Sequence, residues 1–398
     1  MKHLIMILVF IFLLFSCKKQ ENNKDVVLIK YNDTEKVNFS DLFDECAFIF
    51  PESKDPAWFG LQIRKMEMIQ EKMFLYNLTS TGSNILCFDT KGKFLFDINR
   101  FGQGPGEYTL LNDFMIDKKH NILILDVTGN QYGRNEYIYL DLNGNYLYSK
   151  SRQDIEGFPS SMIEYNDSLY IVNVYCALRD NCNDIIFFDK EGLDVIKSFN
   201  CVDKYANENT PSQSFCKTSD SFLFYGGNDT IYTISIEADN PLPAYFVDFG
   251  SQQQQYFKNI VGKTHEEILA LSRKMFTNKE KRSVRHIFSN DKYLAVHYRE
   301  NKNIDTKYDL CSQTLFYDKE KKKTYNTNNM EFDIFNFVKN DKMEIIGCFD
   351  GYFYSILNSP FTRDEINKIA KSKFLSEEDK HSFLNLDEDS NPVIFIFK

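Results

Sequence analysis

The sequence predicts an all-β fold in which one hairpin unit is repeated along the chain. Runs rich in aromatic and β-branched residues recur, each bounded by Asn, Asp, Gly or Lys, and each suits a strand of about 5–6 residues. Three segments share one turn pattern: "FDTKGKF" (88–94), "LDLNGNY" (140–146) and "FDKEGLD" (188–194). A hairpin that returns at a spacing of about 45–50 residues is typical of propeller blades, each too thin to bury its own face.

Each of the three repeated turns has the same local chemistry. An Asp ends one strand and opens the turn, and a Gly supplies the position with positive φ before the next strand returns. The strands and hairpins predicted in this way lie at 72–78, 84–98, 113–126, 137–149, 167–175, 184–199, 221–235, 292–298, 314–325 and 343–349.

Two short helical insertions interrupt the strands. "THEEILALSRKMF" starts with a capping box at Thr264 and Glu267, and "TRDEINKIAKSKFL" repeats the device at Thr362 and Glu365. We expect these helices to decorate the rim of the all-β body. An amphipathic helix that binds a partner is the alternative.

The N-terminus predicts export and lipid attachment. The run from Leu4 to Phe15 is too short to cross a bilayer but has the length of a secretory signal. The following "LFSC" resembles a bacterial lipobox, so we expect a signal peptide at 1–16, a lipidated Cys17 with a flexible tether over 17–30, and a propeller over 31–398. Lys18 after the cysteine favours the outer membrane by analogy with enterobacterial sorting.

Charge and cysteine content narrow the function classes. The net charge of −10 becomes one unit more negative when Lys2 leaves with the signal peptide, which argues against nucleic acid as a partner. Cys176 with Cys182 and Cys201 with Cys216 are candidate disulfides in an exported protein, whereas Cys87 and Cys348 read as buried thiols in strands. No cysteine or histidine spacing suggests zinc, and no cofactor is predicted.

The glycine-rich stretch "RFGQGPGEY" (100–108) has two interpretations. A phosphate-binding loop would open a helix, but further strands follow; moreover Pro105 has no N–H and Glu107 would repel a phosphate. We therefore predict a bend that carries the chain from the outer edge of one blade to the central strand of the next. On this interpretation at least one of Gly102, Gly104 and Gly106 has positive φ.

Residues 85–126 resemble an NHL repeat, and the whole chain resembles the six-bladed β-propeller lipoproteins of the Bacteroidota. The resemblance rests on "LFSC", "KVNFSDLFDECAFIFPE", "GQGPGEY" and the closing "DSNPVIFIFK", and it fits least well between about residues 201 and 285. It implies six blades, and it associates the family with import systems for glycans or peptides. Because a propeller must hide its free sheet edges, we expect "CAFIFPE" and "PVIFIFK" to lie in one blade or in neighbouring blades.

Candidate ligand-binding residues are the charged groups beside the predicted bends and inner-strand ends: Arg64, Arg100, Glu107, His286 and Arg299. Glu107 can alternatively be a cap on the glycine bend. His286 and His297 are too few for the three protein ligands of a catalytic zinc, and no G-x-S-x-G motif is present.

The leading interpretation is a cell-envelope lipoprotein, anchored in the membrane through Cys17, whose propeller surface binds or scaffolds a glycan, peptide or envelope protein. A hydrolase or lyase acting at the mouth of the central channel is the alternative, since carboxylate pairs cannot be placed in space from sequence.

Overall fold

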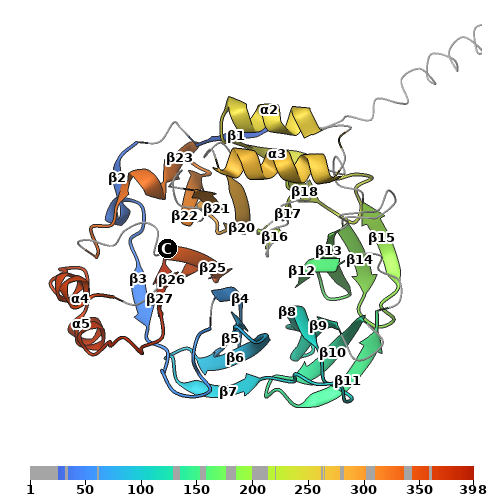
Figure 1. Cartoon of the computed structure of the whole chain (residues 1–398), viewed down its shortest axis with the longest axis horizontal. Coiled ribbons are helices and arrows are strands. Elements are labelled where there is room, and N and C mark those ends of the chain that lie inside the picture. Colours follow the sequence, from blue (N-terminus) through green and yellow to red (C-terminus); the bar gives the residue numbers. More distant parts are fainter. Residues whose placement is uncertain are drawn as a thin grey trace, which may run out of the picture.

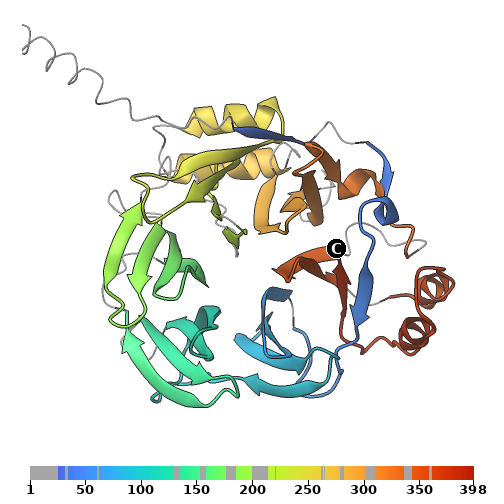
Figure 2. The same ribbon diagram turned by 180° about the vertical axis from the view of Figure 1, so that it is seen from behind.

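The computed structural model shows a closed ring of six blades, viewed from its two faces in Figure 1 and Figure 2. The predicted all-β propeller is therefore confirmed. The residues that the structure describes are 26–31, 35–60, 62–128, 135–152, 158–175, 185–199, 214–219, 221–260, 263, 265–277, 282–301, 310–335, 343–357 and 361–398. In this part of the chain, no helix is long and apolar enough to cross a membrane.

The first three blades are continuous four-stranded antiparallel sheets, each numbered from the channel outward. Blade 1 consists of β4 (Gln62–Ile69), β5 (Lys72–Leu78), β6 (Ser83–Asp89) and β7 (Phe94–Ile98). Blade 2 consists of β8 (Leu110–Asp117), β9 (Ile122–Thr128), β10 (Asn135–Asp141) and β11 (Tyr146–Ser151). Blade 3 consists of β12 (Phe158–Glu164), β13 (Leu169–Tyr175), β14 (Ile185–Asp189) and β15 (Val195–Phe199).

The other three blades include or touch strands from the N-terminal segment. Blade 4 consists of β16 (Phe215–Lys217), β17 (Phe222–Tyr225), β18 (Thr230–Ile234) and β19 (Leu242–Asp248), with β1 (Val27–Lys30) added in parallel outside β19. Blade 5 consists of β20 (Ser283–Ser289), β21 (Tyr293–Asn301), β22 (Leu310–Asp318) and β23 (Lys323–Asn326). Blade 6 consists of β25 (Met343–Phe349), β26 (Tyr352–Leu357), β27 (Val393–Phe397) and β3 (Cys46–Ile49).

The ring closes where the N-terminal strand β3 pairs with the C-terminal strand β27. The pairing is antiparallel and runs from Ile394 opposite Ile49 to Phe397 opposite Cys46. This confirms the predicted pairing of the two terminal strands. The N-terminal segment runs from β1 through β2 (Val37–Asn38) to blade 6. β1 starts before the predicted domain boundary at residue 31. β2 pairs in parallel with β24 (Met330–Glu331) outside blade 5.

The two helical insertions are each a pair of helices. Between blades 4 and 5 in sequence lie α2 (Ser251–Ile260) and α3 (His265–Thr277), at the upper edge of the ring in Figure 1. Thr264 of the predicted capping box is outside the described residues. Between β26 and β27 lie α4 (Arg363–Ile369) and α5 (Glu377–Leu384). Thr362 and Glu365 form the predicted capping box of α4. Both pairs decorate the rim, and α2 and α5 were not predicted.

The repeated Asp turns are confirmed, with one difference in detail. The carboxylates of Asp89, Asp141 and Asp189 each accept backbone N–H groups of their own turn. Gly92 and Gly144 have φ of 87° and 80°, as predicted, but in the third turn Leu193 has the positive φ, 63°, in place of Gly192. The same turn occurs at Asp318 without any glycine, with Lys322 at φ 54°.

The glycine-rich bend joins the outer strand of blade 1 to the inner strand of blade 2, as predicted. Gly106 has φ of 73°, and a Cβ at this position would lie 2.6 Å from the ring of Tyr146 in β11. The carboxylate of Glu107 accepts a hydrogen bond from the Gly104 N–H at 2.8 Å, so Glu107 is the cap of the bend. This geometry lets the chain turn closely against the neighbouring blade.

The apolar core lies between neighbouring blades, because each sheet buries both of its faces. The largest cluster joins blades 5 and 6 to the N-terminal segment, where Phe39 and Phe43 of the turn around η1 (Phe39–Asp41) pack against Phe397 with ring centroids 5.1 and 4.8 Å apart. Cys87 and Cys216 are buried free thiols and Cys348 is a partly buried one; Cys176, Cys182 and Cys201 are outside the described residues. The free thiol of Cys216 argues against its predicted pairing with Cys201.

Replacing Phe397 with Ala should destabilise the whole ring, because this fully buried aromatic side chain of the closing strand packs against Phe39 of the N-terminal segment and Phe316 of blade 5. We expect a loss of about 3–5 kcal/mol in the free energy of unfolding, measured by chemical denaturation. Phe374→Ala is the control, since Phe374 is 43% exposed and should cost little. Equal effects of the two substitutions would contradict a closure at β27.

Candidate functional site

Among the described residues, five of the six inner strands carry a β-bulge, at the third residue of the strand in four of them and at the fourth in β25. The bulges fall at residues 64, 112, 160, 285 and 346, in β4, β8, β12, β20 and β25. A bulge leaves one residue unpaired and turns its side chain away from the regular alternation. In blades 1 and 5 the extra residue is an arginine, Arg64 and Arg285, so both arginines occupy equivalent positions.

Below the bulges, a buried lysine joins blades 1, 2 and 3. The Lys65 ammonium group donates to both carboxylate oxygens of Asp113 at 3.2 Å, to the Phe114 carbonyl at 2.6 Å and to the Met162 carbonyl at 3.0 Å. Asp113 also accepts from the Met162 N–H at 2.7 Å. These contacts satisfy backbone groups that the inner strands expose to the channel. Lys65 therefore serves the architecture of this side of the ring.

On the other side, polar groups of blades 5 and 1 gather around Glu344 of blade 6. Its Oε1 accepts from Gln62 at 3.1 Å and from Arg299 at 3.3 Å. The Nε2 atoms of His286 and His297 lie 3.7 and 4.0 Å from the same oxygen. Together with the two bulge arginines, Arg299 and Glu344 form what we call the arginine cluster: Arg64, Arg285, Arg299 and Glu344.

The two histidines are neutral components of this site. Burial lowers the pKa of His286, and it lowers that of His297 to about 3. Their rings stack with centroids 5.7 Å apart, and the His297 Nδ1 is 3.0 Å from the Thr314 hydroxyl. Burial alone would raise the pKa of Glu344, but the His286 contact and the charge of Arg299 lower it below its ordinary value. The site thus holds one carboxylate and three guanidinium groups.

The cluster contains three positively charged arginines and one negatively charged carboxylate. Burial and the charges of Arg299 and Arg64 lower the pKa of Arg285 to about 10, although Glu344 opposes this shift. Its Nε is buried and has no hydrogen-bond partner among the described residues. The arginines remain partly accessible, since the side chain of Arg299 is 24% exposed. An anion entering this end of the channel would relieve the repulsion between them.

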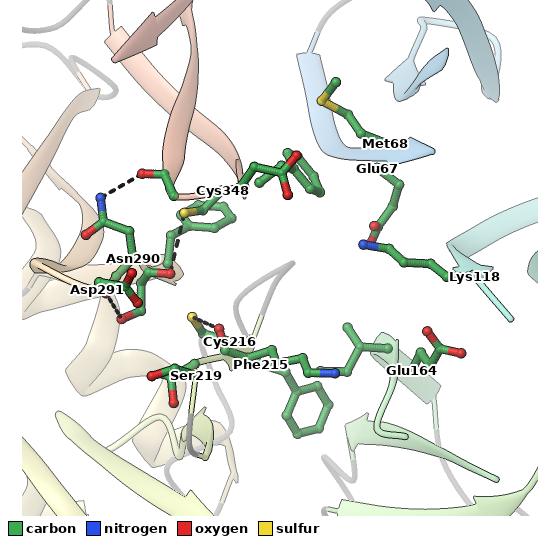
Figure 3. Close-up of a pocket in the computed structure, with 18 of the residues that line it drawn as sticks. Glu67, Met68, Lys118, Glu164, Phe215, Cys216, Ser219, Asn290, Asp291 and Cys348 are labelled. Atoms are coloured by element: carbon green, nitrogen blue, oxygen red, sulfur yellow. Dashed lines mark hydrogen bonds between the residues drawn. The ribbon is translucent and has the colours of Figure 1, made fainter. Parts of the chain in front are cut away.

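The opposite end of the channel holds a cavity of about 440 Å³, shown in Figure 3. The residues that line this cavity lie at the ends of the inner strands, including β4, β20 and β25. Arg64, Arg285 and Glu344 lie several residues earlier in the same three strands. In Figure 3, Glu67 and Lys118 point toward one another on one side and Cys216 and Cys348 lie on the other. Burial raises the pKa of the Cys348 thiol to about 12 and raises that of Cys216, so neither is a thiolate near neutral pH.

Three of the five predicted site residues come together, and two do not. Arg64, His286 and Arg299 lie in or against the arginine cluster. Arg100 donates to the Gly144 carbonyl at 2.9 Å at the rim of blade 2, and Glu107 caps the glycine bend. No group of three His, Cys, Asp or Glu side chains is arranged to hold a metal ion within the described ranges.

Sequence reasoning missed Arg285, Glu344, Lys65 and Asp113. Each is a charged residue inside a strand whose neighbours are mostly buried, as in "QIRKMEMI" for Lys65 and "MEIIGCF" for Glu344. A charged residue within an otherwise apolar strand could have identified these positions, because a charged group in a buried strand needs a partner.

Comparison with known proteins places the chain in a family. Residues 24–398 match the family described as "Domain of unknown function (DUF4934)", so the chain belongs to this family. No curated protein matches it in sequence.

Two solved structures share the fold. A protein from Bacteroides fragilis NCTC 9343 that is described as exported is 18% identical with a TM-score of 0.69, over 94% of this chain and 99% of the other. A member of the DUF4221 family from Bacteroides vulgatus ATCC 8482 is 10% identical with a TM-score of 0.50, over 90% and 97% of the two chains. At these identities the likeness concerns the fold alone.

Acid should destabilise the protein through His297. Because its pKa is about 3 in the folded chain and 6.5 ordinarily, the unfolded chain takes up a proton first, and stability is lost as pH falls below 6.5. At pH 5 this amounts to about 2 kcal/mol. Thermal melts of His297→Gln should therefore decline less between pH 7.5 and pH 5 than wild type, whereas His381→Gln on exposed α5 should follow wild type. Parallel decline in all three proteins would show that His297 does not titrate this way.

Proposed function

We propose that this protein is an exported lipoprotein of the bacterial cell envelope that binds a ligand with an anionic group at the arginine cluster. The observation that carries the proposal is a group of three arginines close enough to lower the pKa of Arg285, accompanied by one carboxylate, Glu344, which Arg299 contacts. The buried Nε of Arg285 has no hydrogen-bond partner among the described residues. Guanidinium groups bind carboxylates and phosphates through paired N–H donors, which makes them suited to an acidic glycan or peptide.

Binding accounts for the cluster better than catalysis does. A general acid or base works best with a pKa near the working pH. Glu344 has a lowered pKa and is ionised, His297 has a pKa of about 3, and the channel thiols are protonated. These properties favour a fixed electrostatic surface over proton transfer, so a hydrolase or lyase at the channel mouth is the weaker proposal.

Export and lipid attachment are supported by the N-terminal sequence and by a relative. "LFSC" after the apolar run resembles a lipobox, and the similar protein of Bacteroides fragilis is described as exported. The outer membrane is the proposed location, and the resemblance to NHL-repeat lipoproteins is part of the same proposal.

Anionic probes should stabilise the protein at the arginine cluster. We expect trigalacturonate, or a short acidic peptide, to raise the melting temperature of wild type, whereas any shift with uncharged maltotriose should be the same in wild type and in the arginine variants. Arg285→Gln and Arg299→Gln should abolish the shift, and Arg273→Gln on exposed α3 should retain it. An anionic probe that stabilises the Arg285 and Arg299 variants as much as wild type binds elsewhere, and the absence of any shift would refute the proposal.

Lipidation should depend on Cys17. In cells that process lipoproteins, Cys17→Ser should move the protein from the detergent-extracted membrane fraction to the soluble fraction, because the acyl chains supply the membrane affinity. Cys46→Ser, which changes an exposed cysteine on β3, should remain in the membrane fraction. Membrane association of the Cys17 variant at the wild-type level would rule out the lipid anchor.

A further inference from the structure

A second depression lies on the channel-cavity face of the ring, in the seam between blades 2 and 3. It has a volume of about 480 Å³, and we call it the tyrosine groove after Tyr139 and Tyr148 on its wall. The turns of blades 2 and 3 supply its polar rim, which includes Lys119, His120 and Asp167. None of these residues belongs to the arginine cluster.

The two tyrosines form an aromatic platform. Their rings are stacked with centroids 4.4 Å apart and an interplanar angle of 18°. Tyr139 is buried, whereas Tyr148 is 41% exposed, and the Lys150 ammonium group lies 5.9 Å from the centre of the Tyr139 ring. The stacked partner fixes the orientation of the exposed ring. A large, rigid and accessible aromatic surface is suited to packing against the C–H groups of a ligand, since the ring face is electronegative.

The aromatic wall of the groove contains a buried hydroxyl group. The Tyr139 hydroxyl is buried and has no hydrogen-bond partner among the described residues. A buried hydroxyl without a partner costs free energy, so Tyr139 is retained here at a cost to the fold.

The charges in the groove are paired with one another, unlike those of the arginine cluster. Asp117 accepts from the Tyr170 hydroxyl and the His120 ring, each at 2.8 Å, and from Lys190 at 3.3 Å. At the rim, the Lys119 ammonium group lies 4.0 Å from the Asp167 carboxylate. The lining carries three lysines and four carboxylates, so the opposite charges nearly balance, which favours a neutral ligand rich in hydroxyl groups.

The groove also adjoins the channel cavity. Lys190 lies on the groove and forms an ion pair with Glu164, which lines the channel cavity. An extended ligand lying in the groove can pass over this ion pair to the channel mouth. A chain of several units would then contact more of the face than a single unit.

We infer that the tyrosine groove binds a neutral saccharide, with the apolar face of one pyranose ring against Tyr148 and the ring hydroxyls bonded to the polar rim. Oligosaccharides that extend toward the channel cavity bind more tightly than monosaccharides. This site is independent of the proposed anionic site on the opposite face.

The test is calorimetric titration of the full mature chain with neutral probes: maltohexaose, cellohexaose, mannohexaose and xylohexaose, each with its monosaccharide. We expect at least one hexasaccharide to bind, and to bind at least tenfold more tightly than its monosaccharide. Tyr148→Ala should weaken that binding at least tenfold, while Tyr148→Phe keeps the ring and stays within about threefold of wild type.

Two control variants distinguish binding in the groove from binding elsewhere on the protein. Leu147→Ala changes the exposed neighbour on β11 that does not line the groove, and should bind as wild type does. Arg285→Gln should also bind neutral saccharides unchanged, so failure of the anionic site leaves this result intact. Binding that survives in Tyr148→Ala, or no binding of any probe at about 10 mM, overturns the inference.

Discussion

The antiparallel pairing of β3 with β27 joins two segments that are almost the whole chain apart, and the closed ring depends on it. Blades 1, 2 and 3 are each built from strands consecutive in sequence, so their ladders form locally. Blade 6 is complete only when the N-terminal strand covers the edge of β27, whose backbone groups would otherwise be open to solvent or to another chain. The arginine cluster spans blades 5, 6 and 1, so its geometry depends on this same closure.

Closure involves more than one strand pair, because the N-terminal segment contacts three successive blades. β1 extends blade 4, β2 pairs beside blade 5, and Phe39 and Phe43 fill the core between blades 5 and 6. The burial of two aromatic rings adds apolar stabilisation to the hydrogen bonds of the strand pairs. Contacts between residues so far apart in sequence require the closure of a long loop, which costs conformational entropy before the contacts stabilise the chain. We therefore expect them to form late in folding. The site at the seam should therefore be completed only in the final stages of folding.

The sequence was informative wherever structure is local. The Asp turns at residues 89, 141 and 189, the capping box at Thr362 and the bend at Gly106 follow from side-chain and backbone chemistry within a few residues. The turn at Asp318 lacked the expected glycine and was missed as a member of the set, because Lys322 adopts positive φ without one.

The candidate site could be predicted only in part, for a geometric reason. Arg64 and Arg100 both lie beside bends in sequence, but Arg64 is the extra residue of an inner-strand bulge, whereas Arg100 follows an outer strand and contacts the neighbouring blade. Bulges have no clear sequence pattern here, since residues as different as Arg285 and Ile346 occupy them. The pairing of blades 5, 6 and 1 around Glu344 is likewise a property of the closed ring rather than of any segment.

Lys65 and the arginine cluster, the two cationic groups of the channel, differ in how far their charge is balanced by neighbouring groups. Lys65 has a carboxylate and two backbone carbonyls within hydrogen-bonding distance, so its burial is compensated inside the protein. The arginine cluster has three guanidinium groups and one carboxylate, which Arg299 contacts, and burial together with the charges of Arg299 and Arg64 lowers the pKa of Arg285. A fold gains nothing from retaining uncompensated charge on an inner strand, because an apolar or neutral residue would be cheaper to bury. This excess of positive charge is the observation on which the proposed anionic site rests.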